Sequence, residues 1–194
     1  MKATRCRRNN VTIHNLIKNR YNRAIKTERN EQIMEGLLPG YKKCFFCGPA
    51  TGGLALELKY VDGEASCEFT ASEKFQGYDG MLHGGIVTGI LDEVMWWTLF
   101  VETKRTCATW KIEVEFKRPV VCGKTYRSSG HLLHTTHYTY HLTGVIKDET
   151  GKICAQGNAS FRRTRGVILE DLIKYLDFRG VPPEIRSLFL SLET

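Results

Sequence analysis

Residues 77–97, GYDGMLHGGIVTGILDEVMWW, place a His-Gly-Gly step directly before a long apolar segment. Apolar side chains recur there at helical spacing, so period and length predict a buried helix over residues 84–101 despite its poor helix formers. The first amides of a helix have no partner within it, and the helix dipole attracts negative charge to that end. We therefore expect the amide of Gly84 to be available to a group that develops negative charge.

Asp92 stands within the same apolar segment, where a carboxylate is costly unless it has a partner or a chemical role. Gly84 and Asp92 are about 12 Å apart along a helix that rises ~1.5 Å per residue. Reacting groups must approach to within about 3–3.5 Å, so one chain cannot easily bring both to one carbonyl. Either one of the two groups acts alone, or two chains with antiparallel helices each supply one part. We favour the second interpretation, which predicts a dimer with shared sites.

The composition suits one domain with an extension, since 194 residues with 42% apolar side chains can fill a core. The chain has seven cysteines, and no apolar leader segment stands at its N-terminus. Reduced thiols in a cytoplasmic protein are the natural interpretation. No uncharged apolar run reaches about 18 residues, so we expect no membrane span.

The positive charge is concentrated at the start of the chain. Residues 1–43 hold eleven of the 28 Lys and Arg residues but only three acids, and the whole chain carries a net charge of +7. We expect a basic, solvated extension that includes a polar helix over residues 11–36. Contact with nucleic acid or anionic lipid is the alternative, and Met34 is a second candidate start of the protein.

The remaining segments alternate in ways that predict strands before and after the helix. Expected strands cover residues 54–60, 65–71, 106–119, 124–133, 137–148 and 152–163, and two short amphipathic helices cover 166–178 and 182–192. An antiparallel sheet that curls around one long helix buries that helix well. The predicted fold class is therefore α+β, with the outer surface or an edge of the sheet free to pair with another subunit.

This order of elements, with HGGIVTGILDE at the start of the helix, closely resembles the hotdog fold. Within that fold the chain resembles the phenylacetyl-CoA thioesterase-like (PaaI-type) acyl-CoA thioesterases. Three segments carry the resemblance together with the helix start: CFFCGPATGGLALEL (44–58), FQGYDGMLHGG (75–85) and TWKIEVEFKRPVVCG (109–123). The resemblance implies a basic N-terminal extension (1–43), a hotdog thioesterase domain (44–165) and a C-terminal helical tail (166–194).

The resemblance also implies an activity, the hydrolysis of an acyl-CoA thioester to a free acid and CoA. Asp92 occupies the position of the family's catalytic carboxylate, acting as general base or nucleophile. His83 matches the motif histidine that orients the thioester or the loop, and the amide of Gly84 matches the donor to the thioester oxygen. Thr109 matches a hydroxyl residue that positions the attacking water.

Three further residues are expected to bind substrate. Gly85 shapes the turn and adds a second amide at the helix start, and Gln76 replaces an asparagine that some relatives carry where this chain has Gly77. Trp96 lies one helical turn after Asp92, on the same face, and is expected to line the acyl pocket.

Other polar residues receive weaker interpretations. Glu93 faces about 100° away from Asp92, which favours a surface or salt-bridge role. Cys44 and Cys47 form a CxxC pair, but no second pair stands nearby in the sequence, so we expect no metal. The same expectation holds for a cluster of four histidines (131, 134, 137 and 141). Four basic residues at strand ends are candidate partners of the CoA phosphates: Lys117, Arg118, Arg162 and Arg163.

Two other functions stay open at this point. One is a non-catalytic acyl-CoA-binding hotdog regulator that uses the basic extension on DNA, and the other is an acyl-CoA dehydratase or isomerase. The spacing from His-Gly-Gly to the acid fits thioesterases better than either. We therefore expect a homodimer or a dimer of dimers that binds acyl-CoA, without a membrane or nucleic-acid partner and without a cofactor other than the CoA of the substrate.

Overall fold

The computed structural model describes residues 35–49, 52–164 and 169–190. Most of the polar helix expected over 11–36, and the question of a start at Met34, lie outside the described residues. Ile33–Thr194 form one compact unit.

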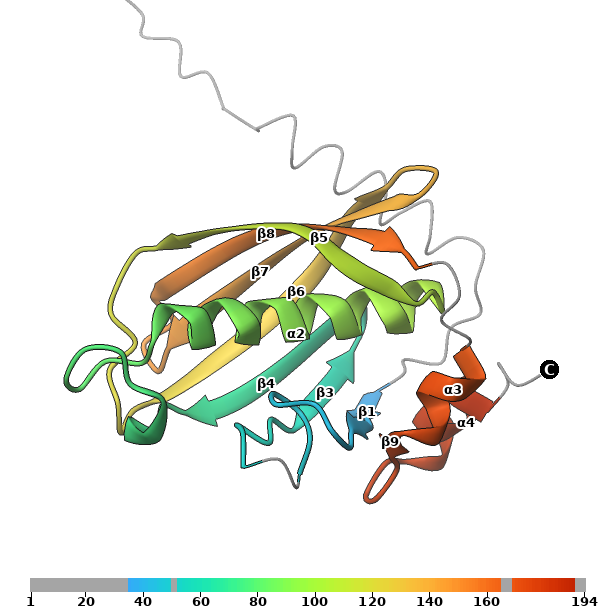
Figure 1. Cartoon of the computed structure of the whole chain (residues 1–194), viewed down its shortest axis with the longest axis horizontal. Helices are drawn as coiled ribbons and strands as arrows, with labels where there is room; N and C mark the ends of the chain where they lie inside the picture. Colours follow the sequence, from blue (N-terminus) through green and yellow to red (C-terminus); the bar gives the residue numbers. More distant parts are fainter. Residues whose placement is uncertain (1–34, 50–51, 165–168, 191–194) are drawn as a thin grey trace, which may run out of the picture. The chain divides into compact units, whose positions relative to one another are not determined.

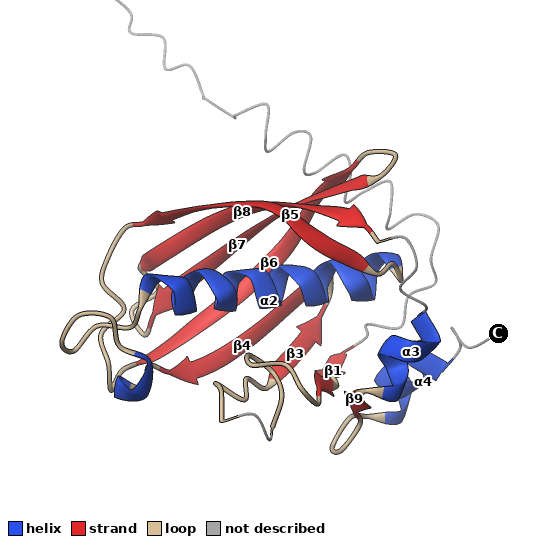
Figure 2. Cartoon of the chain, in the orientation of Figure 1, coloured by secondary structure: helices blue, strands red, loops and turns tan. Residues whose placement is uncertain are grey.

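A single long helix, α2 (Gly84–Thr103), lies in the concave face of a seven-stranded antiparallel sheet, as Figure 1 shows. The strand order is β1-β3-β4-β6-β7-β8-β5. The strands are β1 (Glu35–Leu37), β3 (Leu58–Val61), β4 (Glu64–Thr70), β5 (Cys107–Phe116), β6 (Thr125–Thr135), β7 (Thr139–Asp148) and β8 (Ile153–Arg163). The predicted α+β class and the sheet curled around one helix are confirmed (Figure 2).

Several expected boundaries were wrong. The strand expected from residue 54 is β3, which begins at Leu58, because Ala55 has a φ of 50° that no regular strand accepts. Leu176–Asp177 form strand β9, which pairs with β2 (Gly40–Tyr41), so the helix expected over 166–178 is the shorter α3 (Leu169–Lys174). The last helix is α4 (Pro183–Leu190), and a 3₁₀ turn, η1, covers Glu73–Phe75.

The ends of the compact unit pack onto the sheet and helix. Strand β1 pairs with β3, although it falls inside the segment 1–43 that the sequence set apart as an extension. The boundary expected after residue 43 is therefore corrected: the compact unit starts earlier. At the other end, the Phe189 ring of α4 stacks on Phe100 of α2, with 5.4 Å between ring centroids.

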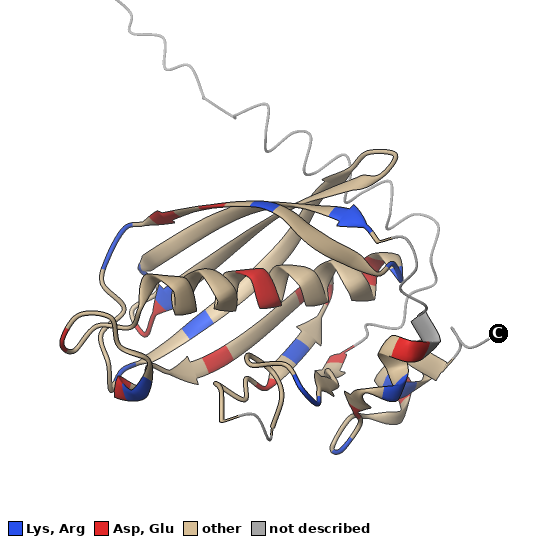
Figure 3. Cartoon of the chain, viewed as in Figure 1, with Lys and Arg blue, Asp and Glu red and all other residues tan. Residues whose placement is uncertain are grey.

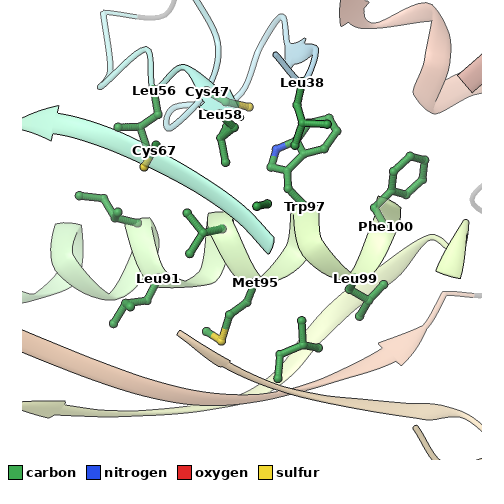
Figure 4. Close-up of a cluster of buried hydrophobic side chains, with 14 of the residues drawn as sticks. Leu38, Cys47, Leu56, Leu58, Cys67, Leu91, Met95, Trp97, Leu99 and Phe100 are labelled. Carbon is green, nitrogen blue, oxygen red and sulfur yellow. The ribbon is translucent and has the colours of Figure 1, made fainter. Parts of the chain in front are cut away.

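The interior explains why α2 is apolar on nearly all sides. Leu91, Met95 and Leu99 lie on one side of the helix and Trp97 and Phe100 on the other, all buried (Figure 4). Among the described helices, α2 is the one long and apolar enough to cross a membrane, and 56% of its apolar window is buried inside the fold. Its composition is therefore that of a core helix.

One buried hydroxyl holds α2 against two strands. The Thr98 hydroxyl accepts from the amide of Ala65 on β4 (3.0 Å), and its one proton is shared between the carbonyl oxygens of Val94 in the helix (2.8 Å) and Gly130 on β6 (3.0 Å). Gly130 has no Cβ, and a Cβ there would lie 2.8 Å from the Val94 carbonyl oxygen. The helix can approach β6 this closely only because residue 130 is glycine.

Thr98→Val tests this attachment, because it keeps the shape of the side chain and removes the hydroxyl. The amide of Ala65 loses its acceptor inside the core, so we expect the free energy of unfolding to fall by about 1–3 kcal/mol. Thr103→Val is the matched control, since the Thr103 hydroxyl bonds only within the helix, to the Leu99 carbonyl. The control should change stability by no more than about 0.5 kcal/mol. Equal urea midpoints for the two variants would contradict the assigned role of Thr98.

Candidate active site

The start of α2 is capped by the side chain of His83. The backbone of His83 is extended, and its ring Nδ1 accepts a hydrogen bond from the amide of Gly85 (2.9 Å). Because Nδ1 accepts, the ring proton is on Nε2. The expectation that Gly85 supplies a second free amide to the substrate was therefore wrong, since His83 occupies that amide.

Gly84 keeps a free amide. No described residue accepts a hydrogen bond from the Gly84 N–H, whereas the amides of Ile86 and Val87 both bond to the His83 carbonyl. A donor without a partner at the positive end of a helix is suited to bind a developing oxyanion. The Gly84 amide is therefore available as a donor, as the sequence indicated.

A pocket of about 560 Å³ lies beside this helix start. Gly84 and His83 form part of its wall, and Phe116, Lys117 and Arg118 at the end of β5 form another part. A Cβ placed on Gly84 would lie 3.5 Å from the Phe116 ring. Sequence reasoning missed Phe116, because strand alternation does not show that this end of β5 lies over the helix start.

The loop that leads to the helix is held by Gln76. Its side-chain Oε1 accepts from the amide of Gly80 (3.1 Å), and an isolated bridge pairs Gln76 with Leu82. The His83 amide donates to the Phe75 carbonyl (2.9 Å). Gln76 therefore shapes the approach to the pocket, and its role toward a substrate stays a prediction.

Asp92 and Thr109 lie together, two turns further along α2. The Thr109 hydroxyl donates to Asp92 Oδ1 (2.8 Å) from the edge strand β5. Burial raises the pKa of Asp92, and the hydrogen bond from Thr109 lowers it. The register between β5 and β8 shifts between Thr109 and Lys111, so Trp110 is the extra residue of a β-bulge at this point.

The Asp92 carboxylate and the Gly84 amide of one chain lie far apart. Asp92 is not among the residues that line the pocket beside Gly84, and the two residues are eight positions apart along the helix. Asp92 and Glu93 follow one another in the chain, and Figure 3 shows an acidic segment in the middle of α2, away from the helix start. We call Gly84 with its pocket the amide half-site, and Asp92 with Thr109 the acid half-site.

Trp96 connects α2 to β5. Its indole Nε1 donates to the Cys107 carbonyl (2.8 Å), and its ring stacks on Phe100 with 5.2 Å between centroids. The side chain is half-buried next to the acid half-site but does not line the pocket at the helix start. Its expected contact with an acyl group stays a prediction.

Glu93 is not the surface or salt-bridge residue that the sequence favoured. Its carboxylate accepts from the Trp97 indole (3.0 Å) and from the Cys44 thiol (3.6 Å). Burial, followed by the nearby Cys44, raises the pKa of Glu93 to about 7. The side chain points away from Asp92, toward the segment that precedes β3.

The basic residues proposed for CoA divide between the two ends of β5. Lys117 and Arg118 lie at the pocket, where Lys117 pairs with Glu115 (2.8 Å) and Arg118 bonds to the Ile153 carbonyl (2.6 Å). The Arg162 guanidinium lies over the Trp110 ring, 3.4 Å from its centroid.

The histidines do not gather into a metal site within the described part of the chain. His134 stacks on His141, with ring centroids 4.4 Å apart, and His131 pairs with Glu64 (2.7 Å). The group of potential metal ligands that the described residues do form contains no histidine.

Comparisons with known proteins agree with this architecture. Residues 79–155 match the family model of the thioesterase superfamily. The Escherichia coli PaaI protein of the phenylacetic acid degradation operon is 18% identical, with a TM-score of 0.54 over 58% of this chain and 82% of that one. A putative thioesterase related to phenylacetic acid degradation from Ralstonia eutropha is 24% identical, with a TM-score of 0.52 over 59% of this chain and 89% of that one.

A third similar structure, from Streptococcus mutans, was determined with acetyl-CoA bound. It is 16% identical, with a TM-score of 0.50 over 53% of this chain and 82% of that one. No curated protein matches the chain by sequence. The matched residues run from the approach to α2 through most of the strands that follow it. Residues 79–155 therefore match the thioesterase superfamily, and the described residues have the hotdog fold that these solved structures share.

Proposed function

We propose that this protein hydrolyses an acyl-CoA thioester to a free acid and CoA, in sites shared between two copies of the chain. One observation carries the proposal: the acid and amide half-sites lie at opposite ends of the same edge strand. The Thr109 end of β5 bonds to Asp92, and the Phe116 end lies at the pocket beside Gly84. The superfamily match and the acetyl-CoA bound by the Streptococcus mutans structure support the substrate class.

Strand β5 has an open edge. It pairs with β8 on one side and with no other described strand, and Trp110 and Phe116 on it are each 58% exposed. An edge of this kind favours pairing with another strand. If β5 pairs with a second β5 in antiparallel fashion about its middle, the Thr109 end of one copy meets the Phe116 end of the other. Each acid half-site then faces the amide half-site of its partner.

The chemistry follows from these groups. The thioester oxygen accepts from the Gly84 amide, which stabilises the oxyanion of the tetrahedral intermediate by roughly 3–4 kcal/mol for one good donor. Asp92 takes a proton from the attacking water, and the CoA sulfur leaves as the intermediate collapses. Thr109 holds the carboxylate in place, and burial strengthens Asp92 as a base. Lys117 and Arg118 supply positive charge for the CoA phosphates, and no further cofactor is needed. We place the reaction in the cytoplasm.

Gly84→Pro removes the proposed oxyanion donor with little change to the fold. Proline suits the first position of a helix, and His83 already has the extended conformation that precedes proline, with φ −60° and ψ 135°. Loss of one such donor should lower kcat by about 10²–10³-fold. Gly84→Ala is the control because it keeps the amide, and it should lose far less. Equal rates for the two variants in a thiol-release assay would remove the Gly84 amide from the mechanism.

Complementation tests the shared site. Asp92→Asn and Gly84→Pro should each be inactive alone, but a dimer containing one of each chain has one intact site. Random pairing at equal amounts should therefore restore about a quarter of wild-type activity. Co-expressed chains with different affinity tags provide the mixed dimer. No recovery in the isolated mixed dimer would show that both groups act within one chain.

The pH dependence tests the bond between Thr109 and Asp92. Asp92 must be ionised to act as a base, so kcat/KM should fall as pH falls through its pKa. Thr109→Val removes the hydrogen bond that lowers this pKa, so the acidic limb of the profile should move to higher pH. Thr109→Ser keeps the hydroxyl and should leave the limb in place. A limb that does not move in Thr109→Val would mean that another group controls it.

A further inference from the structure

The fold brings a third polar group to the CxxC pair. The two sulfurs of Cys44 and Cys47 and a carboxylate oxygen of Glu93 all lie within 4.8 Å of one another. Glu93 is 49 residues from Cys44 along the chain, so the spacing in the sequence gave no sign of this group. Cys47 is buried on the side of α2 that also holds Leu38 and Trp97 (Figure 4).

The segment around the CxxC pair has the turn that a metal-binding pair requires. The amide of Phe46 donates to the Cys44 sulfur (3.3 Å), and the amide of Tyr41 donates to the Cys47 sulfur (3.2 Å). The two amides hold both sulfurs in place on the turn. Gly48 closes the turn, since its amide bonds to the Cys44 carbonyl (2.9 Å) and a Cβ there would lie 2.3 Å from that oxygen.

The segment is also docked on α2 one turn before Glu93. The Phe46 ring fills the space next to Gly89, where a Cβ would lie 2.0 Å from the ring. The amides of Leu54 and Leu56 bond to the carbonyls of Phe45 (2.9 Å) and Phe46 (2.8 Å). These contacts fix the two sulfurs relative to the helix before any ligand binds, which lowers the cost of assembling a site.

Glu93 has no cationic partner within the described part of the chain. Its hydrogen-bond partners are the Trp97 indole and the Cys44 and Cys47 thiols, and no ion pair joins it to a described Lys or Arg. A carboxylate held in the interior usually has a cation or a metal beside it. Asp92 and Thr109 lie on another side of the same helix, so the catalytic proposal makes no use of Glu93.

We propose that Cys44, Cys47 and Glu93 bind a zinc ion, outside both half-sites. A sulfur about 2.3 Å and an oxygen about 2.0 Å from one tetrahedral zinc ion lie about 3.5 Å apart. Cys44 Sγ and Glu93 Oε2 are 3.6 Å apart. Two thiolates and a carboxylate suit zinc better than the harder magnesium or calcium ions. Cys44 is half-buried, so a water completes the four ligands.

Binding releases the two thiol protons and leaves the thiolates, the carboxylate and the ion with a net charge of −1. The ion links the segment that precedes β3 to the middle of α2. It therefore acts as a structural clip, and its affinity for the protein adds to the stability of the folded state.

Metal content provides the test, and it does not depend on hydrolysis. The full-length protein, purified under reducing conditions with zinc present and then dialysed, should hold about one zinc per chain by elemental analysis. Cys44→Ser and Cys47→Ser should each lose the metal, and Cys122→Ser, which lies elsewhere, should keep it. Glu93→Gln keeps an acceptor for Trp97 but is a poor ligand, so competition with a chromophoric chelator should show more than about 100-fold weaker binding.

A titration of the wild-type protein with Co²⁺ keeps the proposal testable if the cysteine variants do not fold. Thiolate charge-transfer absorption and strong visible bands of tetrahedral cobalt, both displaced by zinc, would support the site. Reduced wild-type protein that binds neither metal would overturn it. A Cys44–Cys47 disulfide would also overturn it if the protein takes up no zinc after the disulfide is reduced. Such a disulfide lowers the mass of the chain by about 2 Da relative to the reduced form.

Discussion

The contact at Thr98 and Gly130 sets how closely α2 approaches the sheet. The hydroxyl ties the helix to β4 and β6 at once, and the missing Cβ of Gly130 allows the backbones to approach. A rigid helix fixed at one point carries its other residues to definite places. Gly84 therefore reaches the end of β5 that holds Phe116, and Asp92 reaches the end that holds Thr109.

The edge strand β5 connects the two half-sites. It has the acid half-site at one end and the amide half-site at the other, and its free edge suits a second copy of itself. A single chain has both kinds of group but holds them too far apart to act on one carbonyl. The superfamily match covers residues 79–155, whereas the proposed chemistry of Asp92, Thr109 and Gly84 rests on their positions around this strand.

The strongly periodic segments could be predicted from the sequence, and the contacts between distant segments could not. Helical spacing identified the long helix within two residues of its observed end, and the resemblance to a known family placed Thr109 near Asp92. The strands at 35–41 were missed because they are too short to show alternation and are formed by pairing with distant partners. Glu93 was misjudged for a related reason: its environment depends on where residues 44–47 dock, which no local pattern reveals.

Two neighbouring acids on α2 point to different sides of the helix, Asp92 toward β5 and Glu93 toward residues 44–47. Each added or removed residue turns the helix by about 100°. A one-residue insertion between Gly84 and Asp92 would therefore turn the Asp92 carboxylate toward the place that Glu93 now occupies. Loops tolerate changes in length, but a change in length within this helix would move both carboxylates away from their present neighbours at once, whereas a substitution alters one of them alone.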